Sequence, residues 1–303
     1  MRIGTRASAL ALAQAKLVGG ALRERGAIDS YELVPLVTSG DRGVARADKS
    51  RWVAELEQAL LAGEVDLAVH SAKDVPVQLR DGLELLGAPT RAPAEDVLCG
   101  ARGLEELPPG ARVGTSSLRR GAQLRAARAD LEVLSLRGNV DTRLRRLAEP
   151  DGTPLDAIVL ARAALQRLGR EGEQGAMLDP ERFVPAPGQG TLALQGRAGD
   201  AHTAAAVAAI RDETAMCCLL AERALARELQ ASCHTPLGAH ALPVGEHGLR
   251  VRAWLGLPDG SAWLSDERCG ARAAAQELGA EVAQRMLSAG AREILERAQE
   301  IAA

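Results

Sequence analysis

The sequence is poor in aromatic residues, since its 303 residues include one Phe, one Tyr and three Trp. Proteins that bind single-stranded nucleic acid stack the bases on aromatic side chains, and this chain has too few for such a platform. No apolar run approaches the roughly twenty residues needed to span a bilayer, and no signal peptide precedes the first predicted strand. The sequence therefore predicts a cytoplasmic protein that binds neither nucleic acid nor membrane.

Cysteine is also too sparse and too irregular to organise the fold. The five cysteines form neither an even set nor a Cys-x-x-Cys pair. Disulfide frameworks use even numbers of cysteines, and zinc sites use closely paired ones. We therefore expect reduced thiols and no metal site.

Lysine is the third scarce residue, because only three of the 37 basic residues are lysines, which makes arginine the usual cation of this chain. Nine arginines fall between Arg112 and Arg146. Guanidinium groups pair two-pronged with carboxylate or phosphate and keep their charge. The formal net charge is only −3, so this stretch predicts a small, local polyanionic partner. A solvated helix face is the alternative interpretation.

Hydrophobic periodicity predicts an α/β protein. Strands and helices alternate twice: strands at 2–5, 32–37, 65–69, then 112–114, 132–136, 157–160, and helices at 8–25, 52–63, then 117–128, 140–147, 162–168. A long helix is then expected from Thr203 to about Gln230, followed by a hairpin that turns at residues 258–260 and a final helix from Ala271 onward. This pattern indicates two α/β domains followed by an α+β domain.

Polar motifs follow the predicted strands, where ligands of open parallel sheets bind. They are Thr5-Arg6 with Ser8, Thr38 to Asp41, His70 to Asp74, Gly114 to Ser117, Arg137 to Asn139, and Ala161-Arg162. Ser116 or Ser117 can cap the next helix and leave backbone N–H groups for an anion beside Arg119 and Arg120. Ordinary helix capping is the alternative for any one motif. Together, they predict an anion site in a cleft between two domains.

Two residues of this chain suit chemistry better than anion binding. Asp74 places a carboxylate among arginines, where it would repel an anion, so we expect it to stabilise a developing cation or to move a proton. A plain ion pair with an arginine is the alternative. Cys233 lies in a loop, where its thiol is available, whereas a small buried residue at a domain junction is the commoner role of a free cysteine.

Seven segments in order resemble the hydroxymethylbilane synthase family, also called porphobilinogen deaminase. They read IGTRASALALAQA, VTSGD, LAVHSAKDVP, VGTSSLRR, LSLRGNVDTRL, PAPGQG and SCHTPLGAH. The resemblance implies a transferase of tetrapyrrole (porphyrin and haem) biosynthesis that deaminates porphobilinogen and joins four units head to tail into linear hydroxymethylbilane. It also implies two doubly wound α/β domains that form a cleft like that of a type II solute-binding protein, and a C-terminal α+β domain.

The resemblance also assigns residues and domains. It implies a dipyrromethane cofactor attached to Cys233 by a thioether, with Asp74 as the catalytic carboxylate. The implied carboxylate-binding residues are Arg6, Ser8, Lys73, Thr115, Ser117, Arg119, Arg120, Arg137, Arg143, Arg167 and Gln189. Lys49 and Trp52 are predicted to lie on a lid loop. The expected domains span 1–92 with 189–209, 93–188, and 210–303, and the protein is expected to be a monomer.

Two other functions remain as alternatives. A solute-binding protein for a small polycarboxylate would share the cleft and the arginines, but it would need neither Asp74 nor Cys233. A nucleic-acid-binding protein would use the arginines with stacking aromatics or a recognisable reading motif, and the sequence has neither.

Overall fold

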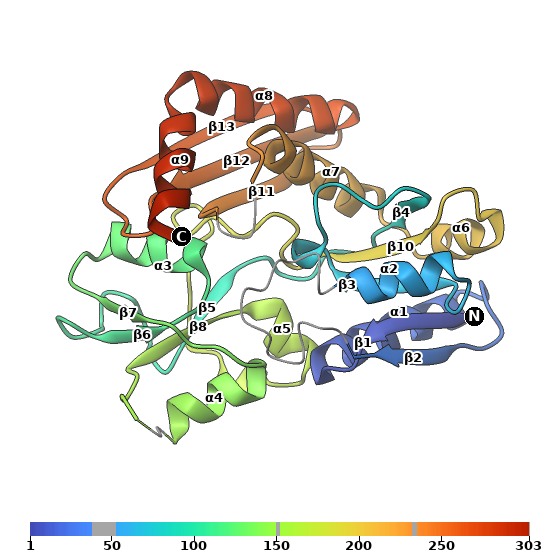
Figure 1. Ribbon diagram of the computed structural model, residues 1–303, viewed down its shortest axis with the longest axis horizontal. Coiled ribbons are helices and arrows are strands. Elements are labelled where there is room, and N and C mark those ends of the chain that lie inside the picture. Colours follow the sequence, from blue (N-terminus) through green and yellow to red (C-terminus); the bar gives the residue numbers. More distant parts are fainter. Residues whose placement is uncertain (38–52, 150–151, 232–234, 303) are drawn as a thin grey trace. The chain divides into compact units, whose positions relative to one another are not determined.

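The computed structural model describes residues 1–37, 53–149, 152–231 and 235–302 of the chain (Figure 1). It divides into two compact units, one made of Met1–Ala92 with Gly190–Leu219 and the other of Pro93–Gln189 with Leu220–Ala303. The expected boundaries of three separate domains stay a prediction.

The first unit is built on a five-stranded sheet with the order β2-β1-β3-β10-β4. The strands are β1 (Arg2–Arg6), β2 (Glu32–Leu36), β3 (Leu67–Ser71), β4 (Leu83–Gly87) and β10 (Leu192–Arg197). β1 is parallel to β2 and β3, whereas β10 runs antiparallel to both of its neighbours. One apolar cluster joins the sheet to α1 (Ala9–Glu24) and α6 (Ala201–Ala208), and another joins it to α2 (Ala54–Leu61). Helices therefore cover both faces of the sheet.

The second unit repeats this topology in a sheet with the order β7-β6-β8-β5-β9. The strands are β5 (Asp96–Cys99), β6 (Arg112–Gly114), β7 (Glu132–Leu134), β8 (Ala157–Ala161) and β9 (Ala176–Met177). One apolar cluster includes Leu124 of α3 (Leu118–Ala127), and another includes residues of α4 (Val140–Ala148) and α5 (Arg162–Arg167). Two doubly wound α/β sheets are therefore confirmed.

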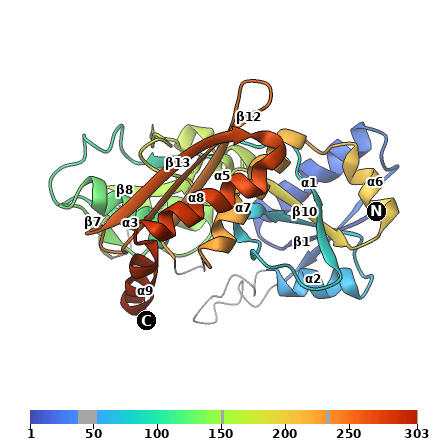
Figure 2. The same cartoon turned by 90° about the horizontal axis from the view of Figure 1, so that it is seen from above.

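The second unit also holds a three-stranded antiparallel sheet with the order β11-β12-β13. Its strands are β11 (Leu237–Val244), β12 (Gly248–Gly256) and β13 (Trp263–Ala271). Figure 2 shows α8 (Ala275–Ser288) lying along this sheet, and α8 contacts both β12 and β13. The predicted turn at 258–260 is confirmed, because Gly260 adopts φ +74° between β12 and β13. The C-terminal α+β region is therefore confirmed as well.

Two long helices predicted from the sequence are wrong, because each is broken in two. The stretch after Thr203 contains α6 and α7 (Glu213–Glu228), and Asp212 starts the second helix by accepting the Ala215 N–H on its side chain at 2.9 Å. The C-terminal stretch contains α8 and α9 (Ala291–Ala302), which are separated at Gly290 with φ +102°. A capping carboxylate and a left-handed glycine interrupt a helical apolar pattern.

The end of α7 stores backbone strain at Gln230, which adopts φ +50°. The N–H of Ala231 donates to the carbonyl of Ala226 at 2.9 Å, which is the closing bond of a helix end that favours glycine. We expect Gln230→Gly to raise the free energy of unfolding by about 0.5–1 kcal/mol, measured by urea denaturation. The exposed Gln284 in α8 is the control: Gln284→Gly should lower the stability by about 1 kcal/mol. If Gln230→Gly and Gln284→Gly lowered the free energy of unfolding equally, Gln230 would not be strained.

Candidate functional site

In the first unit, four of the predicted site residues gather at one edge of the sheet. β1 and β3 are adjacent parallel strands, so their carboxyl ends meet at the same edge. Arg6 ends β1, and Ser8 caps α1 by accepting the Ala11 N–H at 3.3 Å. The short helix that follows β3 contains Lys73 and Asp74. The structure therefore places Arg6, Ser8, Lys73 and Asp74 on neighbouring elements, as the sequence predicts.

The turn that contains Asp74 is fixed by hydrogen bonds from two directions. The Ala72 N–H donates to the carbonyl of Thr191 at 3.0 Å, which joins the turn to the segment before β10. The Gln14 side chain of α1 donates to the Ser71 hydroxyl at 2.9 Å. Because both contacts precede Asp74 by only two or three residues, they restrict where its carboxylate can lie.

A buried histidine lies behind this edge of the sheet. His70 Nε2 lies 3.0 Å from Gln195 Oε1, and Gln195 Nε2 donates to Glu57 Oε1 at 3.0 Å. Since the amide nitrogen of Gln195 faces Glu57, its amide oxygen accepts a hydrogen bond from the Nε2–H group of His70. Burial lowers the pKa of His70 to about 4, with the charge of Asp74 opposing the shift and that of Arg6 adding to it. His70 is therefore neutral at physiological pH and lies within the electrostatic reach of both residues.

The lowered pKa of His70 predicts that the protein loses stability in mild acid. The unfolded chain takes up a proton near pH 6.5 and the folded chain only near pH 4, so stability should fall by about 3 kcal/mol as the pH drops through this window. Urea denaturation at a series of pH values measures the slope. His70→Asn should flatten it, whereas replacing the exposed His247 with Asn should leave it unchanged. An unchanged slope in His70→Asn would contradict this account.

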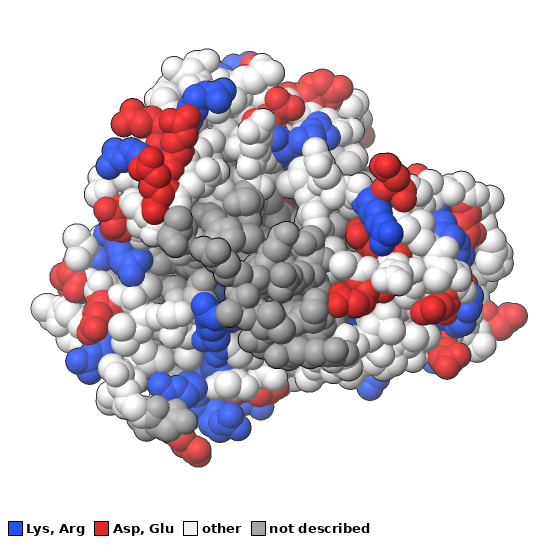
Figure 3. Space-filling view, viewed as in Figure 1, with Lys and Arg blue, Asp and Glu red and all other residues white. Residues whose placement is uncertain are grey.

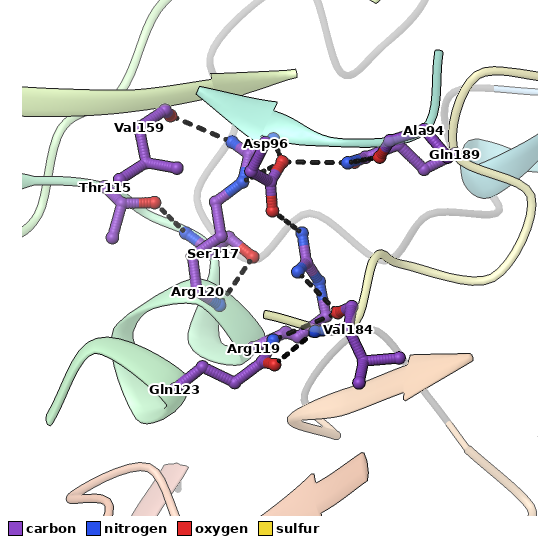
Figure 4. Close-up of polar contacts among 10 residues, drawn as sticks. All are labelled: Ala94, Asp96, Thr115, Ser117, Arg119, Arg120, Gln123, Val159, Val184 and Gln189. Carbon is purple, nitrogen blue, oxygen red and sulfur yellow. Dashed lines mark hydrogen bonds and ion pairs between the residues drawn. The ribbon is translucent and has the colours of Figure 1, made fainter. Parts of the chain in front are cut away.

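In the second unit, two predicted binding arginines converge on a carboxylate that the sequence did not single out (Figure 4). Asp96 begins β5 and is 1% exposed. Its side chain accepts from Arg119 Nη2 at 2.7 Å and from Arg120 Nη2 and Nε at 2.7 and 3.0 Å. Gln189 Nε2 donates to the same carboxylate at 2.8 Å. We call Asp96, Arg119, Arg120 and Gln189 the Asp96 cluster.

Backbone carbonyls hold the two guanidinium groups from the other side. Arg119 Nη1 donates to the carbonyl of Val184 at 2.9 Å, and Arg120 Nη1 donates to that of Val159 at 3.0 Å. Gln123 fixes Val184 in turn, because its side chain accepts the Val184 N–H at 2.7 Å. The two arginines are only 5% and 7% exposed. They are therefore preorganised within the protein rather than extended into solvent.

The charges of the Asp96 cluster do not cancel. Two guanidinium groups and one carboxylate leave a net charge of +1, and Arg119 Nε is buried with no hydrogen-bond partner among the residues that the structure describes. Burial disfavours the charged form of Asp96, yet Arg119 and Arg120 hold its pKa well below the usual range. A buried excess charge is unfavourable unless an opposite charge arrives. The cluster therefore suits one carboxylate of an anionic ligand.

The start of α3 confirms the predicted cap and places two more of the predicted residues. The Ser117 hydroxyl accepts the Arg120 N–H at 3.4 Å, and the Thr115 hydroxyl accepts the Ser117 N–H at 3.2 Å. Both hydroxyls thus organise the first turn of the helix that carries Arg119 and Arg120. A helix N-terminus adds a favourable field for an anion.

The remaining predicted arginines lie on other elements of the second unit. Arg137 is exposed before α4, and Arg143 within α4 donates to the carbonyl of Gly138 at 2.8 Å. Arg167 ends α5, where burial lowers its pKa to about 10. Figure 3 shows basic side chains gathered over α4, which also carries Arg145 and Arg146. The second unit therefore carries basic side chains on and beside α4 as well as in the Asp96 cluster.

Three predicted site residues, Lys49, Trp52 and Cys233, lie outside the described residues. Asp96 is the residue that sequence reasoning missed. Its signal was a carboxylate immediately before the apolar run Val97-Leu98-Cys99, because an acid that begins a buried strand needs cationic partners.

Within the described ranges, no group of three or more His, Cys, Asp or Glu side chains could hold a metal ion. No helix in the described part of the chain has the length and apolar character needed to cross a membrane.

Comparison with known proteins assigns the family. Residues 1–205 match the model described as porphobilinogen deaminase, dipyrromethane cofactor binding domain, and residues 216–288 match that of the porphobilinogen deaminase C-terminal domain. The porphobilinogen deaminase of Deinococcus deserti is 42% identical over 310 residues, covering 98% of each chain. That of Thermus thermophilus is 42% identical over 295 residues, covering 97% of each chain.

A solved structure is also similar to this chain. The periplasmic substrate-binding protein of an ABC transporter from Coxiella burnetii matches 71% of this chain and 94% of its own length, with 13% identity and a TM-score of 0.43.

The family matches show that the protein is an enzyme of the transferase class. Because these models and relatives span nearly all of the sequence, the chain belongs to the porphobilinogen deaminase family.

Proposed function

We propose that this chain is a hydroxymethylbilane synthase that uses porphobilinogen as its substrate and acts in tetrapyrrole biosynthesis. It deaminates porphobilinogen and joins four units head to tail into linear hydroxymethylbilane. Each pyrrole of the product carries an acetate and a propionate, so the growing chain is a polycarboxylate. The Asp96 cluster is the observation that carries this proposal, because its two preorganised arginines and one carboxylate leave a net charge of +1, which suits a carboxylate of the ligand.

The first matched model is that of a dipyrromethane cofactor binding domain, and the residues of this chain fit such a group. Its carboxylates require cations, which the excess charge of the Asp96 cluster supplies, and Arg119 Nε remains available as a buried donor. When bound, dipyrromethane supplies the two-ring primer to which porphobilinogen units are joined. We assign its thioether attachment to Cys233.

The proposed roles of the chain's own residues follow from their charge. Asp74 holds a fixed negative charge beside the porphobilinogen carbon whose C–N bond breaks, and this charge stabilises the cation that develops as ammonia leaves with the bonding electrons. The neutral state of His70 keeps a second positive charge away from Asp74. Carboxylate binding is assigned to Arg6, Ser8, Lys73, Thr115, Ser117, Arg119, Arg120, Arg137, Arg143, Arg167 and Gln189.

Lys49 and Trp52 are assigned to a lid loop. The protein is assigned to the cytoplasm and to the monomeric state, with no nucleic-acid or membrane partner.

Incubation of the purified protein with porphobilinogen tests the proposed function against the solute-binding alternative. A synthase consumes porphobilinogen over many turnovers and releases one ammonia for each unit joined. A solute-binding protein binds at most a stoichiometric amount and releases none. Binding of porphobilinogen without ammonia release would therefore overturn the proposed function.

A further inference from the structure

Helix α7 carries a carboxylate that is completely buried. Glu222 is 0% exposed, its Oε2 accepts the Gly188 N–H at 2.6 Å, and its Oε1 accepts the Ala241 N–H at 2.7 Å. A buried carboxylate is unfavourable unless hydrogen bonds compensate the lost hydration. Here both oxygens accept backbone N–H groups, and these two groups belong to segments that are far apart in the sequence.

One of these two bonds joins the two elements that precede and follow Cys233 in the chain. α7, which contains Glu222, ends at Glu228, and Ala241 lies in β11, which begins at Leu237. The hydrogen bond from Ala241 to the Glu222 side chain therefore joins β11 to α7. The Ala239 N–H, also in β11, donates to the carbonyl of Pro185 at 2.8 Å, which ties the strand to the same region as Gly188.

Gly188 and Gln189 link Glu222 to the Asp96 cluster. Gly188 adopts φ +76°, which favours glycine and orients the peptide whose N–H reaches Glu222. The next residue, Gln189, donates from its side chain to Asp96 at 2.8 Å and to the carbonyl of Ala94 at 2.7 Å. A path of hydrogen bonds and one short backbone segment thus runs from Glu222 to the carboxylate that holds both arginines.

We propose that Glu222 is a positioning residue for the reaction. It holds α7 and β11, the described elements on either side of Cys233 in the sequence, in register with the Asp96 cluster, so that the arginines assigned to carboxylate binding keep one geometry relative to these two elements. This inference rests on the proposed function. Loss of Glu222 lowers the fraction of time spent in the reactive geometry, and it removes none of the side chains assigned to carboxylate binding.

Glu222→Gln tests this role because it keeps the shape of the side chain and replaces one acceptor oxygen with a donor. We expect kcat to fall at least about tenfold while KM changes less than about twofold. Glu228→Gln is the matched control on the same helix, since its side chain is 37% exposed, and it should keep the wild-type kcat and KM. Amide hydrogen exchange at Gly188 and Ala241 should accelerate in Glu222→Gln and stay slow in the control.

A double-mutant cycle with Gln189→Met tests whether the path acts as a unit. If it does, the double variant should lose no more kcat than the worse single variant, within about threefold. Multiplied losses, or a Glu222→Gln kcat equal to that of Glu228→Gln, would overturn the proposal. If Glu222→Gln does not fold, Glu222→Asp replaces it in the same cycle. The shorter side chain of aspartate cannot reach both N–H groups at once. A wild-type kcat in Glu222→Asp would also overturn the proposal. Failure of the proposed function would differ, because the wild-type chain itself would not consume porphobilinogen.

Discussion

Asp74→Asn should lower kcat for porphobilinogen by about 10²–10³-fold with little change in melting temperature or cofactor content. Asparagine has nearly the same shape, so the turn fixed by Ala72 and Ser71 should persist. The substitution removes the negative charge that would stabilise the cation formed as ammonia leaves, and a preorganised charge of this kind has an effect of about this size. Steady-state kinetics with porphobilinogen measure it.

An exposed carboxylate of the same unit is the control for this prediction. Asp81 lies in the loop before β4, and Asp81→Asn should keep the wild-type kcat. If Asp74→Asn turned over porphobilinogen as fast as this control, Asp74 would have no electrostatic role in catalysis.

Asp96→Ala should lower the free energy of unfolding by about 3–5 kcal/mol, because it leaves two buried guanidinium groups without the carboxylate that they contact. Burial disfavours the charged carboxylate, but the arginines hold its pKa below the usual range. Its contribution is therefore present above the unfolded carboxyl pKa of about 4 and is lost as the pH falls through the lower folded value. Urea denaturation at pH 7 measures the loss.

Asp130→Ala is the matched control, since Asp130 forms a surface ion pair with Arg128 at 2.7 Å. Surface pairs contribute little, because solvent screens them and ordering the side chains costs entropy. If both variants lowered the free energy of unfolding only slightly, the buried arginines would not need the Asp96 carboxylate for stability. The charge balance inferred for the Asp96 cluster would then lose its physical basis.

Local patterns predicted most of the elements but not how they pair. The apolar spacing of residues 8–25 and the cap at Ser117 are local features, and the structure has both. The insertion of β10 between β3 and β4 joins residues more than a hundred positions apart, and no pattern within one segment encodes it. The sequence pattern places Asp212 within a helix, because its role as a cap depends on the conformation of the backbone before it.

The candidate site shows the same division between local and distant information. Charge and position pointed to Arg119 and Arg120 as anion-binding residues, and that assignment stays a prediction. Their partner Asp96 lies 23 positions before Arg119, and in the sequence it is marked only by its position directly before a short apolar run. Nothing in the sequence distinguishes Glu222 either, because a glutamate in an Ala-rich helix is typical of a solvated face. Tertiary folding alone brings its carboxylate to Gly188 and Ala241.

Intact mass spectrometry of the purified full-length chain tests the central claim most directly, with Cys233→Ser measured in parallel. The proposed function predicts that the wild-type chain is heavier than its sequence by two linked pyrroles, each with an acetate and a propionate. It predicts that Cys233→Ser has the mass of its sequence and does not convert porphobilinogen. A wild-type chain at its sequence mass that still produces hydroxymethylbilane, or a Cys233→Ser variant that retains the added mass, would contradict it.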